Sequence, residues 1–143
     1  ADVLFRNGLA EAKVKYFDQT LETIVELSKR HDLYIVTNGV TETQKRRLNQ
    51  TPLHKYIKKI FISEETGYQK PNPEFFNYVF NDIGEDERQH SIIVGDSLTS
   101  DILGGINAGI ATCWFNFRGF DHNPGIIPDY EINSWKQLND ILR

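Results

Sequence analysis

Short apolar runs alternate with helical patterns along most of this chain, and this alternation constrains the fold more than any other feature. Runs rich in β-branched and aromatic residues occur at 33–37, 60–63, 91–95 and 111–116. Three of them are almost continuously apolar, which is typical of strands covered on both faces of a parallel sheet. Strands that alternate with helices in this way predict an α/β fold with right-handed crossovers.

Helical patterns fill the intervals between these runs. Apolar residues recur at spacings of about three and four from Phe17 to Leu27, which predicts an amphipathic helix before the first strand. Pro73 is a good first-turn residue for a helix over 74–83. A shorter helix is predicted over 100–108, and a strand–helix pair closes the chain. These elements account for most of the residues without an interdomain linker.

The composition limits the class of protein. The chain has 143 residues, of which 39% are hydrophobic, so it can bury a core as one domain. The net charge of −4 gives no basic field for nucleic acid, and Cys113 as the single cysteine excludes an intramolecular disulfide. Apolar runs reach about five residues, against roughly 20 needed to span a bilayer. We therefore expect a cytoplasmic protein that binds neither nucleic acid nor membrane.

The first strand ends in the segment Thr37-Asn38-Gly39. A hydroxyl and an amide at a strand end, with a glycine that lets the backbone approach closely, suit an anionic oxygen. Taken alone, the segment is more typical of a strand-to-helix turn whose side chains satisfy backbone groups.

Lys70 lies beyond the second strand, beside Pro71 and Pro73. The two prolines stiffen the chain, so the direction of the ammonium group can be fixed, and a held ammonium is a good point charge for a phosphate. Alone, the pattern is also typical of a solvated lysine beside a helix that begins at a proline.

Asp96 follows the third strand directly, and Asp101 lies about one helical turn beyond the intervening turn. Two carboxylates there suit Mg²⁺, which takes one or two protein carboxylates; the alternative is a pair of helix caps. Because strand ends meet at one edge of a parallel sheet, the hydroxyl, the lysine and the carboxylates together predict a phosphoryl-transfer pocket.

The order Thr-Asn-Gly, Lys-Pro-x-Pro, Gly-Asp-Ser-x-x-x-Asp resembles the second, third and fourth motifs of the haloacid dehalogenase-like hydrolase superfamily. The stretches LYIVTNGVTETQKRRL and SEETGYQKPNPEFF are similar to its pyrimidine 5′-nucleotidase-like phosphatase branch. The similarity runs from about Phe17 to the carboxyl end. It implies a Rossmann-like parallel sheet with helices on both faces, and an Mg²⁺-dependent phosphatase acting on a small phosphorylated metabolite.

The resemblance also implies roles for individual residues. Thr37 hydrogen-bonds a phosphoryl oxygen, with Asn38 and the backbone at Gly39 helping to hold the group. Lys70 balances the charge of the nucleophile and of the transferring phosphoryl. Asp96 binds Mg²⁺, and Asp101 either supports the metal shell or orients Lys70. Substrate specificity in this family lies largely in a separate cap domain.

The first motif of the family, Asp-x-Asp-x-Thr at the end of the first strand, is missing. No Asp-x-Asp precedes Thr37, and Arg6 stands where a nucleophile belongs if 1–5 form a strand. We therefore expect residues 1–16 to be the tail of a cap or linker, and 17–143 to be the carboxyl-terminal part of the core. The central strand of the sheet is then absent, or another segment takes its place.

Two functions follow from this pattern. The first is a phosphatase whose aspartyl-phosphate nucleophile lies outside this chain, with nucleoside monophosphates as candidate substrates; the chain alone is then inactive. The second is a non-catalytic phosphate- or metal-binding module that has lost the nucleophile. An upstream Asp-x-Asp-x-Thr in the reading frame would support the first.

Overall fold

Six parallel strands in the order β3-β2-β1-β4-β5-β6 form the centre of the computed structural model, which describes residues 2–6, 14–39, 41–50 and 52–142. The four runs predicted as strands each coincide with a strand to within a residue, and the predicted closing strand is also present, which confirms the α/β parallel sheet. The strands are β1 (Asp2–Arg6), β2 (Asp32–Thr37), β3 (Lys59–Ile62), β4 (Ser91–Gly95), β5 (Ala111–Phe115) and β6 (Tyr130–Ile132).

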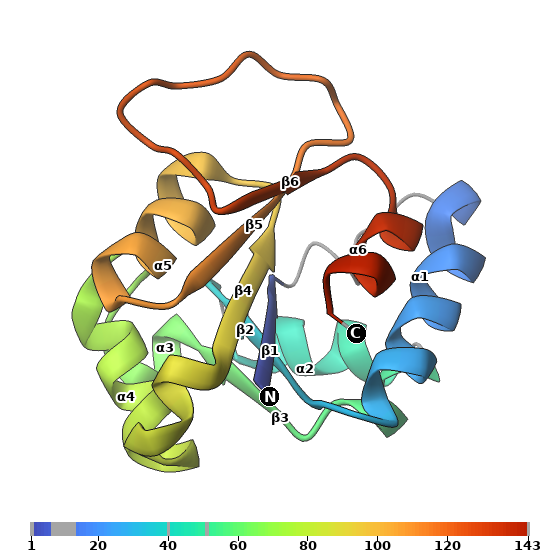
Figure 1. The fold of residues 1–143 in the computed structure, drawn as a ribbon. Helices are drawn as coiled ribbons and strands as arrows, with labels where there is room; N and C mark the ends of the chain where they lie inside the picture. The colour runs from blue at the N-terminus through green and yellow to red at the C-terminus, as the bar shows by residue number, and fades with distance from the viewer. Residues whose placement is uncertain (1, 7–13, 40, 51, 143) are drawn as a thin grey trace.

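Helices cover both faces of the sheet (Figure 1). One face carries α1 (Val14–Ser28) and α6 (Trp135–Ile141), with the short η2 (Pro52–Tyr56) beside α1. The other face carries α4 (Pro73–Ile83) and α5 (Leu103–Ala108). No helix of the described residues is long and apolar enough to cross a membrane. The remaining short elements are α2 (Thr41–Asn49), α3 (Ser63–Thr66), η3 (Glu85–His90) and the π-helical turn η4 (Leu98–Ile102).

Alternate residues of the strands supply two separate cores. In β2, Leu33 and Ile35 pack toward α1 and α6, whereas Tyr34 and Val36 pack toward α4. This follows from the pleat, which turns successive side chains to opposite faces. A fully buried aliphatic side chain contributes about 1.5–3 kcal/mol. The sheet that carries the polar strand ends is therefore held from both sides.

Two adjacent glycines let α5 lie directly against the sheet on one side and against α4 on another. A Cβ at Gly105 would come within 2.6 Å of Ile93 Cγ2 and 2.7 Å of Thr112 Cγ2. A Cβ at Gly104 would come within 2.8 Å of the Phe76 ring. Because real Cβ atoms do not approach so closely, larger residues here would push α5 away and displace the turn η4 that precedes it.

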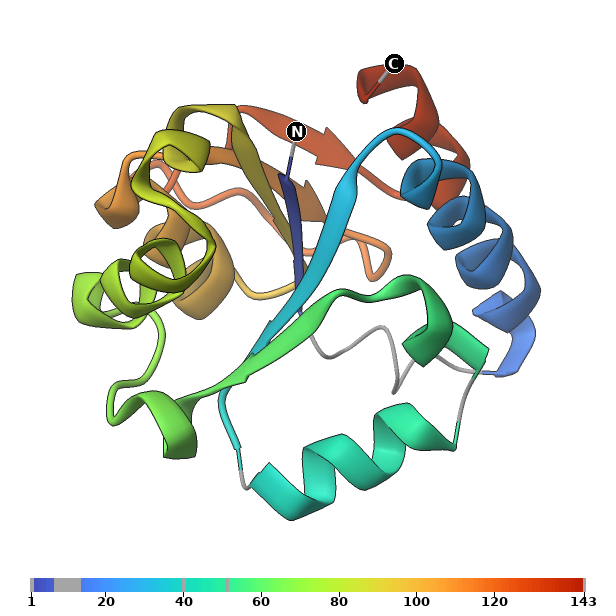
Figure 2. The ribbon, with the colours of Figure 1, turned by 90° about the horizontal axis from the view of Figure 1, so that it is seen from below.

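The central position of the sheet is filled, contrary to the expectation of a missing strand. In β1, Val3 is in register with Leu33 of β2 and with Ile92 of β4, and Figure 2 shows β1 running between these two strands. The segment expected as a cap tail is thus a strand at 2–6, and α1 begins at Val14; residues 1 and 7–13 lie outside the described residues. The physical reason is that β2 and β4 would otherwise each expose an unpaired row of buried backbone groups.

The strand order creates a switch point between β1 and β4. The chain runs outward from β1 through β2 to β3, then returns to β4 and runs outward the other way to β6. In open α/β sheets, ligands bind in the crevice at the carboxyl ends of the strands where this reversal occurs. The residues that follow β2 and β4 flank this point.

Candidate active site

A buried ion pair between Lys70 and Asp101 lies beneath the carboxyl edge of the sheet. The Lys70 side chain is 2% exposed and that of Asp101 is fully buried. Lys70 Nζ donates hydrogen bonds to Asp101 Oδ1 at 2.6 Å and to the Val36 carbonyl at 3.1 Å. Isolated charges are costly to bury, whereas a hydrogen-bonded pair is tolerated. The lysine therefore has one defined position, next to the strand end that carries Thr37.

The Asn38 side chain holds the backbone of Lys70 in place. Its Oδ1 accepts a hydrogen bond from the Lys70 backbone N–H at 2.9 Å, and its Nδ2 donates to the Lys70 carbonyl at 3.2 Å. The Lys70–Pro71 peptide bond is cis. The structure thus shows Asn38 positioning Lys70, a contact that the sequence did not reveal; its expected contact with a phosphoryl group stays a prediction.

Thr37 and Gly39 border the same site. Thr37 is 4% exposed, and its hydroxyl donates to the Asn38 carbonyl at 3.2 Å. The Gly39 N–H donates to Ser63 Oγ at 3.0 Å, which ties the end of β2 to the start of α3. These contacts hold the segment after β2 in place beside Lys70.

Gly95 makes room for Asp101. A Cβ at Gly95 would lie 2.5 Å from Asp101 Cγ and 2.6 Å from its Cβ, and would overlap Oδ2. Asp101 Oδ2 accepts the Ser97 N–H at 3.3 Å, while Oδ1 is engaged by Lys70. Of the two roles that the sequence left open for Asp101, these contacts favour orienting Lys70. Through Asp101, the ends of β2 and β4 are connected at one point.

Asp96 is the more accessible carboxylate. Its side chain is 15% exposed, and Oδ2 accepts Arg118 Nη1 at 3.2 Å. Its backbone carbonyl accepts the indole N–H of Trp114 at 3.1 Å. Trp114 is buried, and its indole N–H also anchors the end of β4. Only the fold could show this, because 18 residues separate the two.

Asp96 faces a cavity of about 350 Å³ at the carboxyl edge of the sheet. Its walls come from the turn after β4, from β5 and from the segment after β5, which we call the β5–β6 loop (116–129). In Figure 1 this loop rises beyond the strand ends. The lining residues are Asp96, Ser97, Leu98, Thr99, Trp114, Arg118 and Phe120.

The buried side chain of Asn116 organises the β5–β6 loop. Its Oδ1 accepts the Phe120 N–H at 2.8 Å, and its Nδ2 donates to the Phe120 carbonyl at 2.9 Å and to Glu131 Oε2 at 3.0 Å. The hydrogen bond from Asn116, with a further one from His122, lowers the pKa of Glu131. An asparagine at the end of an apolar strand was the sequence signal for this role, and our prediction did not use it.

Asp96 is the residue that makes the site suitable for a divalent cation. No group of three or more His, Cys, Asp or Glu side chains within the described part of the chain forms a metal cage. Mg²⁺ needs fewer protein ligands, since it usually keeps several waters and binds one or two carboxylates together with substrate oxygens. Asp96 has the required donor at the cavity. Asp2, the acid of β1, is in register with Asp32 and Ser91 at the opposite edge of the sheet.

Comparison with known proteins assigns most of the chain to one family. The model of the haloacid dehalogenase-like hydrolase family matches residues 4–115. The chain is 43% identical to pyrimidine 5′-nucleotidase YjjG of Escherichia coli over 76% of its own length and 48% of that protein. It is 38% identical to pyrimidine 5′-nucleotidase PynA of Streptococcus pneumoniae over 85% of its length and 51% of that protein.

A solved structure shares the fold at high similarity. The crystal structure of the HAD-hydrolase YfnB from Bacillus subtilis, determined with magnesium bound, superposes with a TM-score of 0.85 and 48% identity. The match covers 88% of this chain and 55% of that one. This chain belongs to the haloacid dehalogenase-like hydrolase family, and it spans about half the length of the relatives it matches. The resemblance of the three motifs is thereby confirmed.

Proposed function

We propose that this chain carries the phosphate- and metal-binding half of an Mg²⁺-dependent phosphatase that hydrolyses a small phosphorylated metabolite. The observation that carries the proposal is the buried Lys70 ammonium, held by Asp101 and Val36 at the carboxyl edge of the sheet. Burying a lysine there has a cost. Phosphate binding explains why the lysine is buried despite this cost. A phosphate monoester carries negative charge, and a fixed cation beside a hydroxyl and an accessible carboxylate would bind it.

Each site residue has a defined task in this proposal. The Thr37 hydroxyl hydrogen-bonds a phosphoryl oxygen, and Lys70 balances the charge of the phosphoryl group. Asp96 contributes a metal ligand, and Asp101 keeps Lys70 in place. Bound Mg²⁺ supplies further charge neutralisation, which matters because two like unit charges at about 4 Å repel by roughly 4 kcal/mol at an effective dielectric of 20.

The nucleophile, in this proposal, lies outside the chain. The aspartyl-phosphate route needs a carboxylate at the carboxyl end of the central strand. In this chain the central strand is β1, which ends at Arg6, so the strand that carries the nucleophile would take the place of β1 in the sheet. No Asp-x-Asp occurs before Thr37, and Asp2 of β1 is at the other edge of the sheet. The chain alone should therefore bind phosphate without turning over a phosphate ester.

Nucleoside monophosphates are the proposed substrate class. Two relatives are named as pyrimidine 5′-nucleotidases, and the chain is 43% and 38% identical to them. Other relatives at about 30% identity are named as N-acylneuraminate-9-phosphatase and glyceraldehyde 3-phosphate phosphatase. The higher identity favours the nucleotide.

A non-catalytic phosphate- or metal-binding module is the second candidate, and the missing nucleophile is the observation that favours it. The reading frame that encodes the chain distinguishes the two. An Asp-x-Asp-x-Thr upstream of Ala1 would support the phosphatase, and its absence would support the binding module.

Binding of inorganic phosphate in the presence of Mg²⁺ tests the site itself. Calorimetry on the wild type, on Lys70→Gln and on Lys58→Gln compares two identical changes of charge. Lys58 pairs with Asp32 at the amino edge of the sheet and is 61% exposed. We expect the wild type and Lys58→Gln to bind phosphate equally, and Lys70→Gln to bind at least tenfold more weakly.

Turnover is measured on the same samples with uridine 5′-monophosphate as substrate. Release of phosphate by the chain alone would contradict the claim that the nucleophile lies elsewhere. Phosphate binding that is unchanged in Lys70→Gln would overturn the proposed site.

A further inference from the structure

The cavity beside Asp96 has a chemical character that phosphoryl transfer does not explain. Phosphate recognition by Thr37, Lys70 and Asp96 needs charge and hydrogen bonds. The cavity is also lined by the aromatic residues Trp114 and Phe120. At about 350 Å³, the cavity lies within the range of small-molecule sites.

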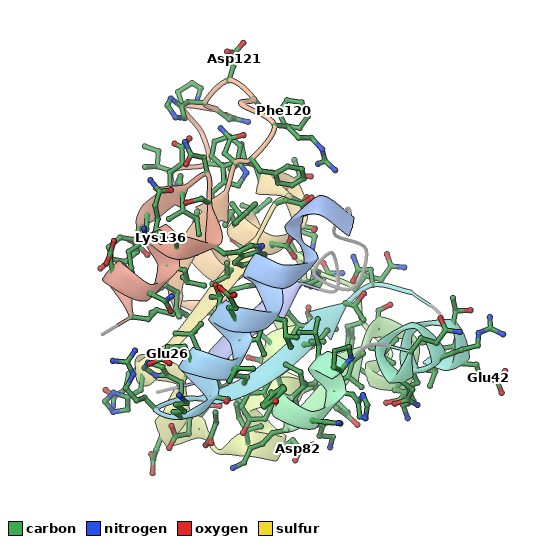
Figure 3. All side chains as sticks on the ribbon, turned by 90° about the vertical axis from the view of Figure 1, so that its right-hand side faces the viewer. Glu26, Glu42, Asp82, Phe120, Asp121 and Lys136 are labelled. Atoms are coloured by element: carbon green, nitrogen blue, oxygen red, sulfur yellow. The ribbon has the colours of Figure 1, made fainter. Side chains whose placement is uncertain are left out.

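Phe120 is exposed although its backbone is firmly held. Phe120 is 57% exposed. Its backbone N–H and carbonyl both form hydrogen bonds with the side chain of the buried Asn116. Figure 3 shows Phe120 at the top of the β5–β6 loop, beside Asp121, which points away from the molecule. An aromatic ring kept in water by a rigid anchor is typical of a surface that a ligand covers.

Further contacts fix the rest of the loop. Asp129 Oδ2 accepts the Thr112 N–H at 2.9 Å, and the Thr112 hydroxyl accepts the Asp129 N–H at 2.9 Å. His122 Nε2 lies 2.6 Å from Glu131 Oε1. Both ends of the loop are therefore tied to β5 and β6, so the cavity wall is formed before any ligand arrives.

Arg118 joins the charged and aromatic parts of the cavity. Its guanidinium lies 4.5 Å from the Phe117 ring centre and 5.8 Å from that of Phe120, while Nη1 reaches Asp96. A guanidinium presents five N–H donors in one plane. Among the described residues, Arg118 donates to Asp96 Oδ2. Hydrogen-bond donors next to an aromatic ring suit a flat ligand that carries carbonyl oxygens.

We propose that this cavity binds the leaving group of the substrate, and that this alcohol carries a planar heterocycle with carbonyl oxygens. The ring stacks on Phe120, Arg118 donates to its oxygens, and the phosphoryl end points toward Asp96. The inference rests on the proposed function. The family resemblance assigns substrate specificity to the cap, and the cavity would add a second determinant of specificity in the core domain. A short aliphatic leaving group would leave the aromatic wall uncovered.

The test compares ligands that share a phosphate but differ in the ring. Uridine 5′-monophosphate and glycerol 3-phosphate are titrated into the chain with Mg²⁺, and the indole N–H resonance of Trp114 reports occupancy of the cavity. Trp135→Phe assigns that resonance, since Trp135 lies in α6 on one face of the sheet. We expect uridine 5′-monophosphate to bind about tenfold more tightly, in line with the effect of one base stacked on an aromatic side chain.

Two variants of the same loop locate the preference. Phe120→Ala should reduce the tenfold preference to about twofold or less. Ile127→Ala removes a side chain from a residue that is 72% exposed and does not line the cavity, so it should leave the preference unchanged. Equal affinities of the wild type for the two ligands, or a preference that survives in Phe120→Ala, would overturn the proposal.

Uridine without phosphate separates this inference from the proposed function. A shift of the Trp114 resonance by uridine that is lost in Phe120→Ala supports the cavity even if phosphate itself fails to bind. Conversely, phosphate binding that depends on Lys70, with no response of Trp114 to uridine, supports the phosphate site and refutes the cavity proposal.

Discussion

At the scale of single residues, the ion pair of Lys70 and Asp101 is the most informative feature of the site. Both side chains are almost completely removed from water. A buried pair of this kind stabilises a fold little compared with apolar residues of the same size, yet removing one partner is expensive because the other charge is left uncompensated. Such a pair is therefore better explained by function than by stability.

Variants of the pair test this interpretation. We expect Lys70→Met and Asp101→Asn each to lower the free energy of unfolding by about 3–5 kcal/mol, and the double variant to lose about 2 kcal/mol or less. All three should lose phosphate binding. Urea denaturation measures the stabilities, and a double variant as unstable as the sum of the single ones would show that the charges are not coupled.

At the scale of the element, β5 combines a packing role with a site role. Cys113 is fully buried in the core that faces α1 and α6, while its neighbour Trp114 faces the cavity. Burial in this apolar environment raises the pKa of the Cys113 thiol to about 12, from its ordinary value of 9.0. The strand thus keeps its thiol neutral and unreactive.

The raised pKa has a consequence for stability at high pH. The unfolded thiol ionises above pH 9.0 while the folded one stays neutral up to about pH 12, so stability is complete below pH 9.0 and falls as the pH rises between these values. Relative to Cys113→Ala, the wild type should lose about 2 kcal/mol by about pH 10.5. Denaturation of both proteins as a function of pH measures this, and parallel curves would contradict the buried position of the thiol.

At the scale of the whole molecule, β1 decides how the two halves of the sheet are joined. It pairs with β2 on one side and β4 on the other, so it lies between the strands that carry Thr37 and Asp96. A strand paired on both sides uses all of its backbone groups, and a proline there removes a ladder hydrogen bond. The sequence had indicated a cap tail for this segment.

Two substitutions at Leu4 distinguish these alternatives. Leu4 is in register with Tyr34 and with Ile93. Leu4→Ala and Leu4→Pro remove the same side chain, but only the proline removes the N–H. If β1 is the central strand, Leu4→Pro should be less stable than Leu4→Ala by about 1–3 kcal/mol, because a buried carbonyl loses its donor. Equal thermal unfolding of the two variants would mean that 2–6 do not belong to the sheet.

Much of the fold and of the site was predictable because the signals are local. Apolar runs marked β2, β4 and β5 to within a residue, since strands buried on both faces need them. Thr37 and Asp96 were proposed as site residues because Thr37 ends one such strand and Asp96 directly follows another. The roles of Asn38 and Asn116 were not identified, because each depends on a hydrogen bond whose partner only the fold brings close.

The sequence by itself determined the α/β class, the order of the strand-end motifs and the residue types that suit a phosphate. The tertiary structure decided three further matters: which segment occupies the centre of the sheet, that Asp101 faces Lys70 across 31 residues of chain, and that Trp114, Arg118 and Phe120 enclose one cavity with Asp96. The physical reason is the same in each case. Local pattern fixes which surface an element buries, but the pairing of distant backbone and charged groups depends on which elements the completed sheet makes neighbours.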